Sequence, residues 1–182
     1  MADKINKRIS KFLSLILRHR PEVVEIKLDD GGWAKVEELI QKVNAKGEQL
    51  TLEQLEFIVD NNDKKRFTFN DDKTLIRASQ GHSIEVDLGL QQKTPPSILY
   101  HGTAVKNIAS IEKQGLLKRN RNHVHLSANI ELAIQVGQRH GKPVVFEIDA
   151  LTMNKDGYRF FLSKNEVWLT EEVPVKYLKK MS

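Results

Sequence analysis

The chain has 182 residues, of which 40% are hydrophobic and 29% charged, and this balance excludes a disordered chain and favours a protein with a buried core. It contains no cysteine, so disulfides, a thiolate nucleophile and cysteine-bound zinc are all excluded. The net charge of +5 favours a polyanionic partner, and the lack of an apolar run of ~20 residues favours a cytoplasmic protein that contacts no membrane.

The first predicted elements are three helices. Apolar residues recur every three or four positions over residues 5–17, with Lys and Arg between them, and Pro21 stops this helix. A second helix is predicted to begin near Trp33-Ala34 and to end at Gly47. Thr51 is a suitable N-cap for a third helix.

The hydrophobic period then changes to two, which indicates strands. Phe67 and Phe69 alternate with polar residues, residues 70–73 predict a turn, and residues 74–78 predict a second strand. Three helices followed by a hairpin is the order of a winged-helix domain. We therefore expect a first lobe over residues 1–85.

A linker is predicted over residues 86–97, where Pro95-Pro96 forbids helix. The second lobe, residues 98–182, is expected to mix short strands with helices, which makes the whole chain α+β. Strands are predicted at residues 98–100, 144–148 and 167–169, and helices at about 104–114 and 129–139.

Arginine and histidine gather at four places, namely Arg18-His19-Arg20, Lys64-Lys65-Arg66, Arg119 to His125, and Arg139-His140. Taken alone, the first group is better explained by cations that complement a helix C-terminus, an effect worth ~0.3–1 kcal/mol, than by a catalytic site. The second group resembles a solvated face. It directly precedes a strand, however, so Arg66 can be held at a fixed depth while its neighbours point outward.

Two further groups leave more than one interpretation open. His123-Val124-His125 on a strand places both imidazoles on one face, but no third ligand stands at a recognisable spacing, so we expect no metal. His101-Gly102-Thr103 follows the strand at residues 98–100, where Gly allows a ligand to approach the backbone and the other two supply hydrogen-bonding groups. An ordinary turn into a helix, with Thr103 as N-cap, fits equally well.

Several ordered blocks span the chain almost from end to end. They are Phe12 to His19, Asp63 to Phe67, Ile76-Arg77-Ala78 with Gln80-Gly81-His82-Ser83, Leu99 to Thr103, His123 to Ser127, and Val167 to Thr170. With this combination the chain resembles the NAD-dependent RNA 2′-phosphotransferases. The resemblance implies an N-terminal winged-helix lobe that binds RNA, a C-terminal ADP-ribosyltransferase-like lobe that is rich in β-structure and binds NAD⁺, and an active site between them.

The resemblance also implies the reaction. The RNA 2′-phosphate attacks the anomeric carbon of the nicotinamide ribose, and nicotinamide leaves. The ribose 2″-hydroxyl then attacks the phosphorus, which releases 2′-hydroxyl RNA and ADP-ribose 1″,2″-cyclic phosphate. NAD⁺ is consumed as co-substrate, no metal is needed, and we expect a monomer.

Residue roles follow from the motif positions that the resemblance matches. Arg18, His19, Arg66 and Arg121 are implied as the catalytic cationic cluster. His101, Gly102, Thr103, His125, Ser127 and Arg139 are implied to bind NAD⁺, although Arg139 also fits a solvated helix end. Arg18, Arg66, Arg77 and His82 are implied to bind RNA phosphate. We choose Arg121 over Arg119 because it stands four residues before His125, and His19 either binds phosphate or transfers a proton.

Two other classes of function explain part of the same pattern. A winged-helix regulator that binds nucleic acid and a small effector accounts for the basic charge and the hairpin, but not for the ordered His and Arg motifs. An ADP-ribosyltransferase that modifies nucleic-acid ends accounts for the NAD⁺ motifs. Release of ADP-ribose cyclic phosphate would support phosphate transfer, a stable ADP-ribosylated product would support the modifying transferase, and no release of nicotinamide would support the regulator.

Overall fold

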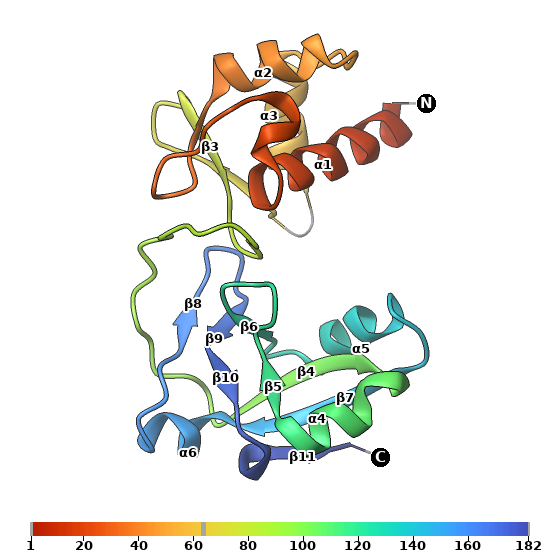
Figure 1. The fold of residues 1–182 in the computed structure, drawn as a ribbon, viewed down its shortest axis with the longest axis vertical. Coiled ribbons are helices and arrows are strands. Elements are labelled where there is room, and N and C mark those ends of the chain that lie inside the picture. Colours follow the sequence, from red (N-terminus) through yellow and green to blue (C-terminus); the bar gives the residue numbers. More distant parts are fainter. Residues whose placement is uncertain (1, 63–64, 182) are drawn as a thin grey trace. The chain divides into compact units, whose positions relative to one another are not determined.

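The computed structural model describes residues 2–62 and 65–181 and shows a mixed α+β protein (Figure 1). The chain divides into two compact units, unit 1 (Met1–Gly89) and unit 2 (Leu90–Ser182). Each unit has its own hydrophobic core.

Unit 1 combines helices with a small antiparallel sheet. In chain order its elements are α1 (Ala2–Arg18), the 3₁₀ helix η1 (Pro21–Val24), β1 (Ala34–Lys35), α2 (Val36–Ala45), α3 (Leu52–Asp60), β2 (Phe67–Phe69) and β3 (Leu75–Ala78). The sheet order is β1-β3-β2, so β3 is the central strand and pairs antiparallel with both neighbours.

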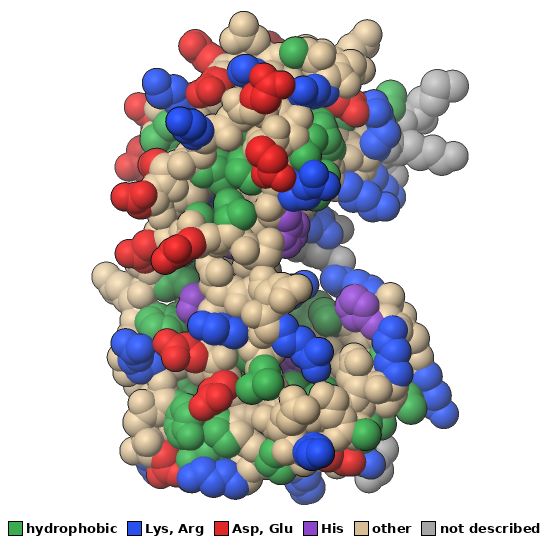
Figure 2. Space-filling model, in the orientation of Figure 1, with side chains coloured by type: hydrophobic (Ala, Val, Ile, Leu, Met, Phe, Trp, Pro, Cys, Tyr) green, Lys and Arg blue, Asp and Glu red, His purple; other side chains and the backbone are tan. Residues whose placement is uncertain are grey.

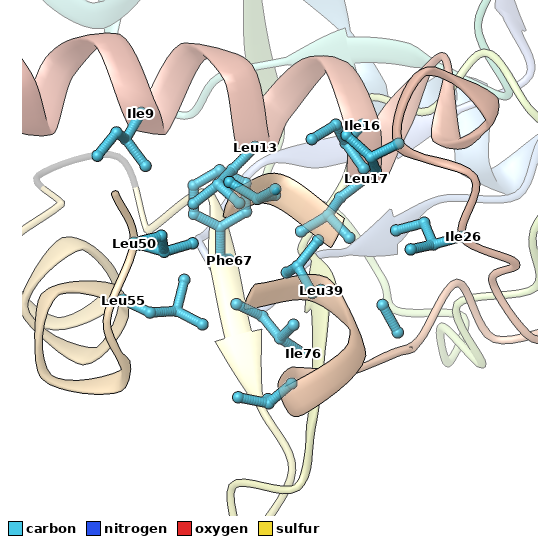
Figure 3. Packing of buried hydrophobic residues seen from close by; sticks show 14 of the residues in the cluster. Ile9, Leu13, Ile16, Leu17, Ile26, Leu39, Leu50, Leu55, Phe67 and Ile76 are labelled. Atoms are coloured by element: carbon cyan, nitrogen blue, oxygen red, sulfur yellow. The ribbon is translucent and has the colours of Figure 1, made fainter. Parts of the chain in front are cut away.

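The core of unit 1 forms where the apolar face of α1 meets the other helices and the sheet (Figure 3). Leu13 and Leu17 of α1 are fully buried, as are Leu39 of α2 and Ile76 of β3. Burying a side chain of this size stabilises the fold by about 1.5–3 kcal/mol relative to exposure. The apolar face therefore fixes α1 in the unit and, with it, the position of Arg18 at its last turn.

Most of the elements predicted for unit 1 are confirmed. Helix α1 covers the predicted range, and the Thr51 hydroxyl accepts a hydrogen bond from the backbone N–H of Gln54 at the start of α3. The predicted start of the second helix is wrong, because Ala34–Lys35 pairs with Ile76 and Leu75 as strand β1. Helix α2 therefore begins only at Val36.

Unit 2 contains most of the strands. Its elements are β4 (Ile98–Ala104), η2 (Val105–Asn107), α4 (Ile108–Gln114), β5 (Leu116–Leu117), β6 (Val124–Leu126), α5 (Ile130–Gln138), β7 (Pro143–Asp149), α6 (Ala150–Lys155), β8 (Phe161–Leu162), β9 (Trp168–Thr170), β10 (Glu172–Val173), η3 (Val175–Tyr177) and β11 (Leu178–Lys180). Two sheets of three strands have the orders β11-β7-β4 and β6-β9-β8, and β10 pairs with β5.

Strand β4 joins the two larger sheets of unit 2. It pairs with β7 along its whole length. Tyr100 of β4 also exchanges two backbone hydrogen bonds, of 2.8 and 2.9 Å, with Ser127, the residue that follows β6. The bridge brings the first half of β4 next to the end of β6.

The strand predicted at residues 98–100 is longer in the structure. Gly102 and Thr103 pair with Val145 and Val144 of β7, so the strand continues to Ala104. Thr103 is therefore not a helix N-cap, and the helix predicted from residue 104 begins as α4 only at Ile108. The helix predicted at residues 129–139 is confirmed as α5, whose first turn is capped by Asn129.

No helix in the described part of the chain is long and apolar enough to cross a membrane.

Candidate active site

Three of the predicted site residues of unit 1 meet at the end of α1. Arg18 is the last residue of the helix, and its Nη2 donates a hydrogen bond of 3.3 Å to the backbone carbonyl of Arg66. Nη1 of Arg66 in turn donates to the side-chain oxygen of Asn62, at 3.2 Å. The core therefore positions Arg18, and Arg18 is tied to the segment that leads into β2.

His19 directly follows α1 and contacts the loop after β3. Its Nδ1 lies 2.9 Å from the hydroxyl oxygen of Ser83. The backbone N–H of Ser83 donates to the carbonyl of Arg18, at 2.9 Å. Arg18, His19 and Arg66 thus form one network, which we call the α1-end cluster.

Arg77 is half-buried, like the members of the α1-end cluster, whereas His82 is buried. The guanidinium of Arg77 stacks 4.4 Å from the ring centre of Trp33 and donates to the carbonyl of Gly31, at 3.1 Å. His82 is 1% exposed, and within the described structure neither ring nitrogen has a hydrogen-bond partner. Burial, together with the nearby positive charges of Arg18, His19 and Arg77, lowers the pKa of His82 to about 4, so the ring is neutral at pH 7.

A second group of predicted residues meets in unit 2, and we call it the β4–β6 cluster. Nδ1–H of His101 donates to the backbone carbonyl of His125, at 3.1 Å. Nη1 of Arg121 donates to Nδ1 of His125, at 3.4 Å. Burial, with a smaller effect of the charge of Arg121, lowers the pKa of His101. The cluster therefore combines a neutral imidazole with an exposed guanidinium.

The structure distinguishes the two arginines of the loop before β6. Arg121 reaches His125, whereas Nη2 of Arg119 donates to the hydroxyl of Ser110 on α4, at 3.2 Å. Arg119 also has a left-handed backbone, with φ of 50°. Arg121 thus contacts another predicted site residue, and its catalytic role stays a prediction.

Gly102 has a packing role that the sequence did not indicate. A Cβ atom at this position would lie 1.6 Å from the carbonyl oxygen of Ala133 in α5. On that side of the strand the backbone is therefore approached by helix α5. Thr103 is 5% exposed and its hydroxyl accepts a hydrogen bond from Asn107.

The other predicted residues lie near the ends of α5. The Ser127 hydroxyl donates to the carbonyl of Asn129 and accepts from its N–H, so it orders the chain just before the helix. Arg139 follows α5 and is exposed. In the described ranges, 2–62 and 65–181, no group of three or more His, Asp or Glu is arranged to hold a metal ion.

The α1-end cluster is also contacted by residues that the sequence analysis did not single out, namely Asn62, Ser79 and Ser83. Asn62 contacts Arg66, and nothing in its sequence context indicated this role. Ser83 contacts His19 and stands in the block Gln80 to Ser83, which did carry a signal. Lys64 of the predicted basic run lies outside the described residues.

A protein that gathers Arg and His in this way is suited to phosphate chemistry, because guanidinium groups bind phosphate oxygens in pairs. The comparison with protein families agrees with that class. Residues 4–172 match the model of the family described as "RNA 2′-phosphotransferase, Tpt1 / KptA family". The chain belongs to this family, which confirms the resemblance inferred from the ordered blocks.

Curated relatives match over almost their whole length. A protein of Flavobacterium johnsoniae named "Probable RNA 2′-phosphotransferase" is 54% identical over 178 residues, which cover 98% of each chain. A protein of Fusobacterium nucleatum with the same name is 54% identical over 173 residues, covering 94% of this chain and 97% of its own. A third, from Nostoc punctiforme, is 50% identical over 181 residues and covers all of both chains.

Proposed function

We propose that this protein removes an internal 2′-phosphate from RNA and transfers it to NAD⁺. The observation that carries the proposal is the joining of Arg18, His19 and Arg66 in one hydrogen-bonded network, within a chain that belongs to the RNA 2′-phosphotransferase family. NAD⁺ is a substrate in this reaction. The products are 2′-hydroxyl RNA, nicotinamide and ADP-ribose 1″,2″-cyclic phosphate.

In this proposal the α1-end cluster binds the RNA 2′-phosphate. Two guanidinium groups can neutralise a phosphomonoester dianion and aim one of its oxygens at a reacting carbon. The same cations stabilise charge on the phosphoryl oxygens in the second step, when the ribose 2″-hydroxyl attacks phosphorus. Both steps of the proposed reaction require positioned cations, and neither requires a nucleophilic side chain.

The β4–β6 cluster is proposed to bind NAD⁺. Because the His125 carbonyl accepts the Nδ1–H of His101, the other nitrogen of the neutral ring is an acceptor suited to a ribose hydroxyl. Arg121 adds a cation suited to the pyrophosphate or the transferring phosphate. Gly102 and Ser127 contribute by holding α5 and its first turn in place.

The remaining assignments are part of the same proposal. We infer a winged-helix lobe for unit 1, supported by its element order, and an ADP-ribosyltransferase-like lobe for unit 2. Direct contacts of Arg77 and His82 with RNA phosphate, and of Thr103 and Arg139 with NAD⁺, stay predictions. The role of His19 stays either phosphate binding or proton transfer.

The test follows a single labelled phosphate. The protein is incubated with an oligonucleotide that carries one internal ³²P-labelled 2′-phosphate, with and without NAD⁺. We expect the label to move to a small NAD-derived product only when NAD⁺ is present. Label that stays on 2′-phosphorylated RNA would favour the regulator, and a stable ADP-ribosylated RNA would favour the nucleic-acid-modifying transferase.

Matched pairs of arginines test the residue assignments in the same assay. Arg18→Ala and Arg121→Ala are expected to lower the rate by at least ~10²-fold, the loss typical of removing one preorganised charge partner. The controls Arg20→Ala and Arg119→Ala each remove a charge two residues away from the tested arginine. Arg20 contacts Glu22, and Arg119 contacts Ser110. These two controls are expected to stay within about threefold of the unmodified rate, since exposed contacts contribute ~0–1 kcal/mol. Equal losses within a pair would contradict the assignment.

A further inference from the structure

Ser83 connects two segments that are far apart in the sequence. Its backbone N–H donates to the carbonyl of Arg18, and its hydroxyl oxygen lies 2.9 Å from Nδ1 of His19, across 64 residues of chain. The proposed reaction assigns no role to this serine. One short residue thus contacts two members of the α1-end cluster.

The loop that carries Ser83 also contacts the α1-end cluster at its beginning, through Ser79. The N–H of Ser79 donates to the carbonyl of Arg66, at 2.8 Å, and its hydroxyl donates to the carbonyl of Lys65. Between these two serines lies His82, which is buried in unit 1. Residues 79–83 therefore contact the backbone of both arginines of the cluster and are anchored by a buried side chain.

The direction of the contact with Nδ1 is linked to what the opposite nitrogen of His19 can do. When the Ser83 hydroxyl donates to Nδ1 of the neutral ring, the proton of the ring is on Nε2. When the ring is an imidazolium, Nε2 is protonated again and Nδ1–H donates to the hydroxyl oxygen. In these two states Nε2–H is a donor, which is the form that a phosphate oxygen requires. A neutral ring whose Nδ1–H donates to the hydroxyl oxygen has an acceptor at Nε2 instead, and the tautomer measurement below distinguishes the two directions.

We propose that Ser83 is a positioning residue of the phosphate transfer. It fixes the ring of His19 and holds Nε2 in the protonated form that donates to the RNA 2′-phosphate. The inference rests on the proposed function, in which His19 contacts that phosphate. Ser83 itself acts through His19 and contacts no reacting atom.

The first test compares two substitutions of Ser83 in the labelled-phosphate assay. Ser83→Ala removes the hydroxyl and keeps the backbone contact to Arg18, so we expect about a tenfold lower rate, as for the loss of one hydrogen bond to a charged group or a residue that orients a catalytic one. Ser83→Thr retains the hydroxyl and is expected to restore most of the rate. Ser14→Ala is the control, since this serine on α1 donates only to the carbonyl of Ser10.

The second test observes the ring of His19 directly. We expect ¹⁵N chemical shifts of the neutral ring to show the Nε2-protonated tautomer in the unmodified chain and in Ser83→Thr, and a mixture of tautomers in Ser83→Ala. Loss of fold alone would lower the melting temperature and would not produce this pattern. His19→Ala, assayed by NMR, identifies the signals of this ring.

The third test asks whether Ser83 acts through His19. Binding of the 2′-phosphorylated oligonucleotide is measured without NAD⁺ for Ser83→Ala, His19→Ala and the double variant. We expect Ser83→Ala to weaken binding in the unmodified background and to have no further effect when His19 is absent. Equal effects in both backgrounds, or an unchanged rate and tautomer in Ser83→Ala, would overturn the inference. If the unmodified protein neither binds the 2′-phosphate nor transfers it, the proposed function fails instead.

Discussion

At the scale of single residues, the charge state of His82 links the stability of unit 1 to pH. Its pKa of about 4 in the folded chain lies below the value of 6.5 for a free side chain, because burial and neighbouring cations oppose protonation. Between these two values the unfolded chain binds more protons than the folded one. Acid therefore favours unfolding in this range, and the stability of unit 1 falls as the pH is lowered from about 6.5 toward 4.

We expect this single group to lower the free energy of unfolding by about 2 kcal/mol between pH 7 and pH 5. Other groups also titrate, so the quantity to measure is the difference in stability between the unmodified chain and His82→Gln. Urea unfolding, followed by NMR signals of the unit 1 core, provides it at each pH. The difference should shift in favour of the variant at pH 5. A difference that does not change with pH would show that His82 titrates alike in both states.

At the scale of elements, the contact between β4 and α5 holds the β4–β6 cluster in place. Gly102 of β4 faces the Ala133 carbonyl, and a Cβ at Gly137 of α5 would lie 2.6 Å from the Thr103 carbonyl. Two glycines thus allow the helix and the strand to approach closely. Because His101 precedes Gly102 on β4, a displaced helix would also move the residue proposed to bind NAD⁺.

Gly102→Ala is expected to destabilise unit 2 by about 3 kcal/mol or more, since its Cβ would overlap backbone atoms that have no way to rotate aside. Gly157→Ala is the matched control. Gly157 has φ of 98° and no atom within 4 Å of an added Cβ, so this change costs only backbone strain, about 1 kcal/mol. Thermal unfolding of both variants compares the two costs, and equal melting temperatures would argue against the close contact.

The sequence predicted those elements whose signals are local. Helix α1 has a complete apolar stripe, and α3 and α5 have side-chain caps at Thr51 and Asn129, so pattern and capping were sufficient. Strand β1 and the second half of β4 were not predicted, because their extended backbone depends on pairing with distant strands. For the same reason the grouping of Arg18 with Arg66 came from the family resemblance, and the contact of Ser83 with His19 came only from the structure.

At the scale of the whole molecule, positive charge is unevenly divided between the two units. Unit 1 has 15 Lys and Arg against 16 Asp and Glu, whereas unit 2 has 14 against 8. Within unit 1 the basic residues concentrate on α1. The sequence of this helix contains a single acidic residue, Asp3. Figure 2 shows Lys and Arg along the edge of unit 1 where α1 begins, and Asp and Glu mainly along the opposite edge. Unit 1 is therefore nearly neutral in sum, but its basic residues gather on α1, whose last residue is Arg18.

This division predicts which charges contribute to RNA binding. Lys7 and Lys11 are exposed, and their spacing places them on the same side of α1 as Arg18, where they can accompany phosphates next to the bound 2′-phosphate. For a single strand, each phosphate neutralised contributes about 0.7 to the slope of log affinity against log salt. Replacing both lysines by Gln should therefore reduce the slope by about 1.4, whereas Lys27→Gln with Lys35→Gln, which removes the same charge elsewhere in unit 1, should leave it unchanged. Fluorescence anisotropy with a 2′-phosphorylated oligonucleotide measures both slopes. If both pairs lower the slope equally, RNA responds to the total charge of the unit; if only the α1 pair does, the strand follows the helix toward Arg18.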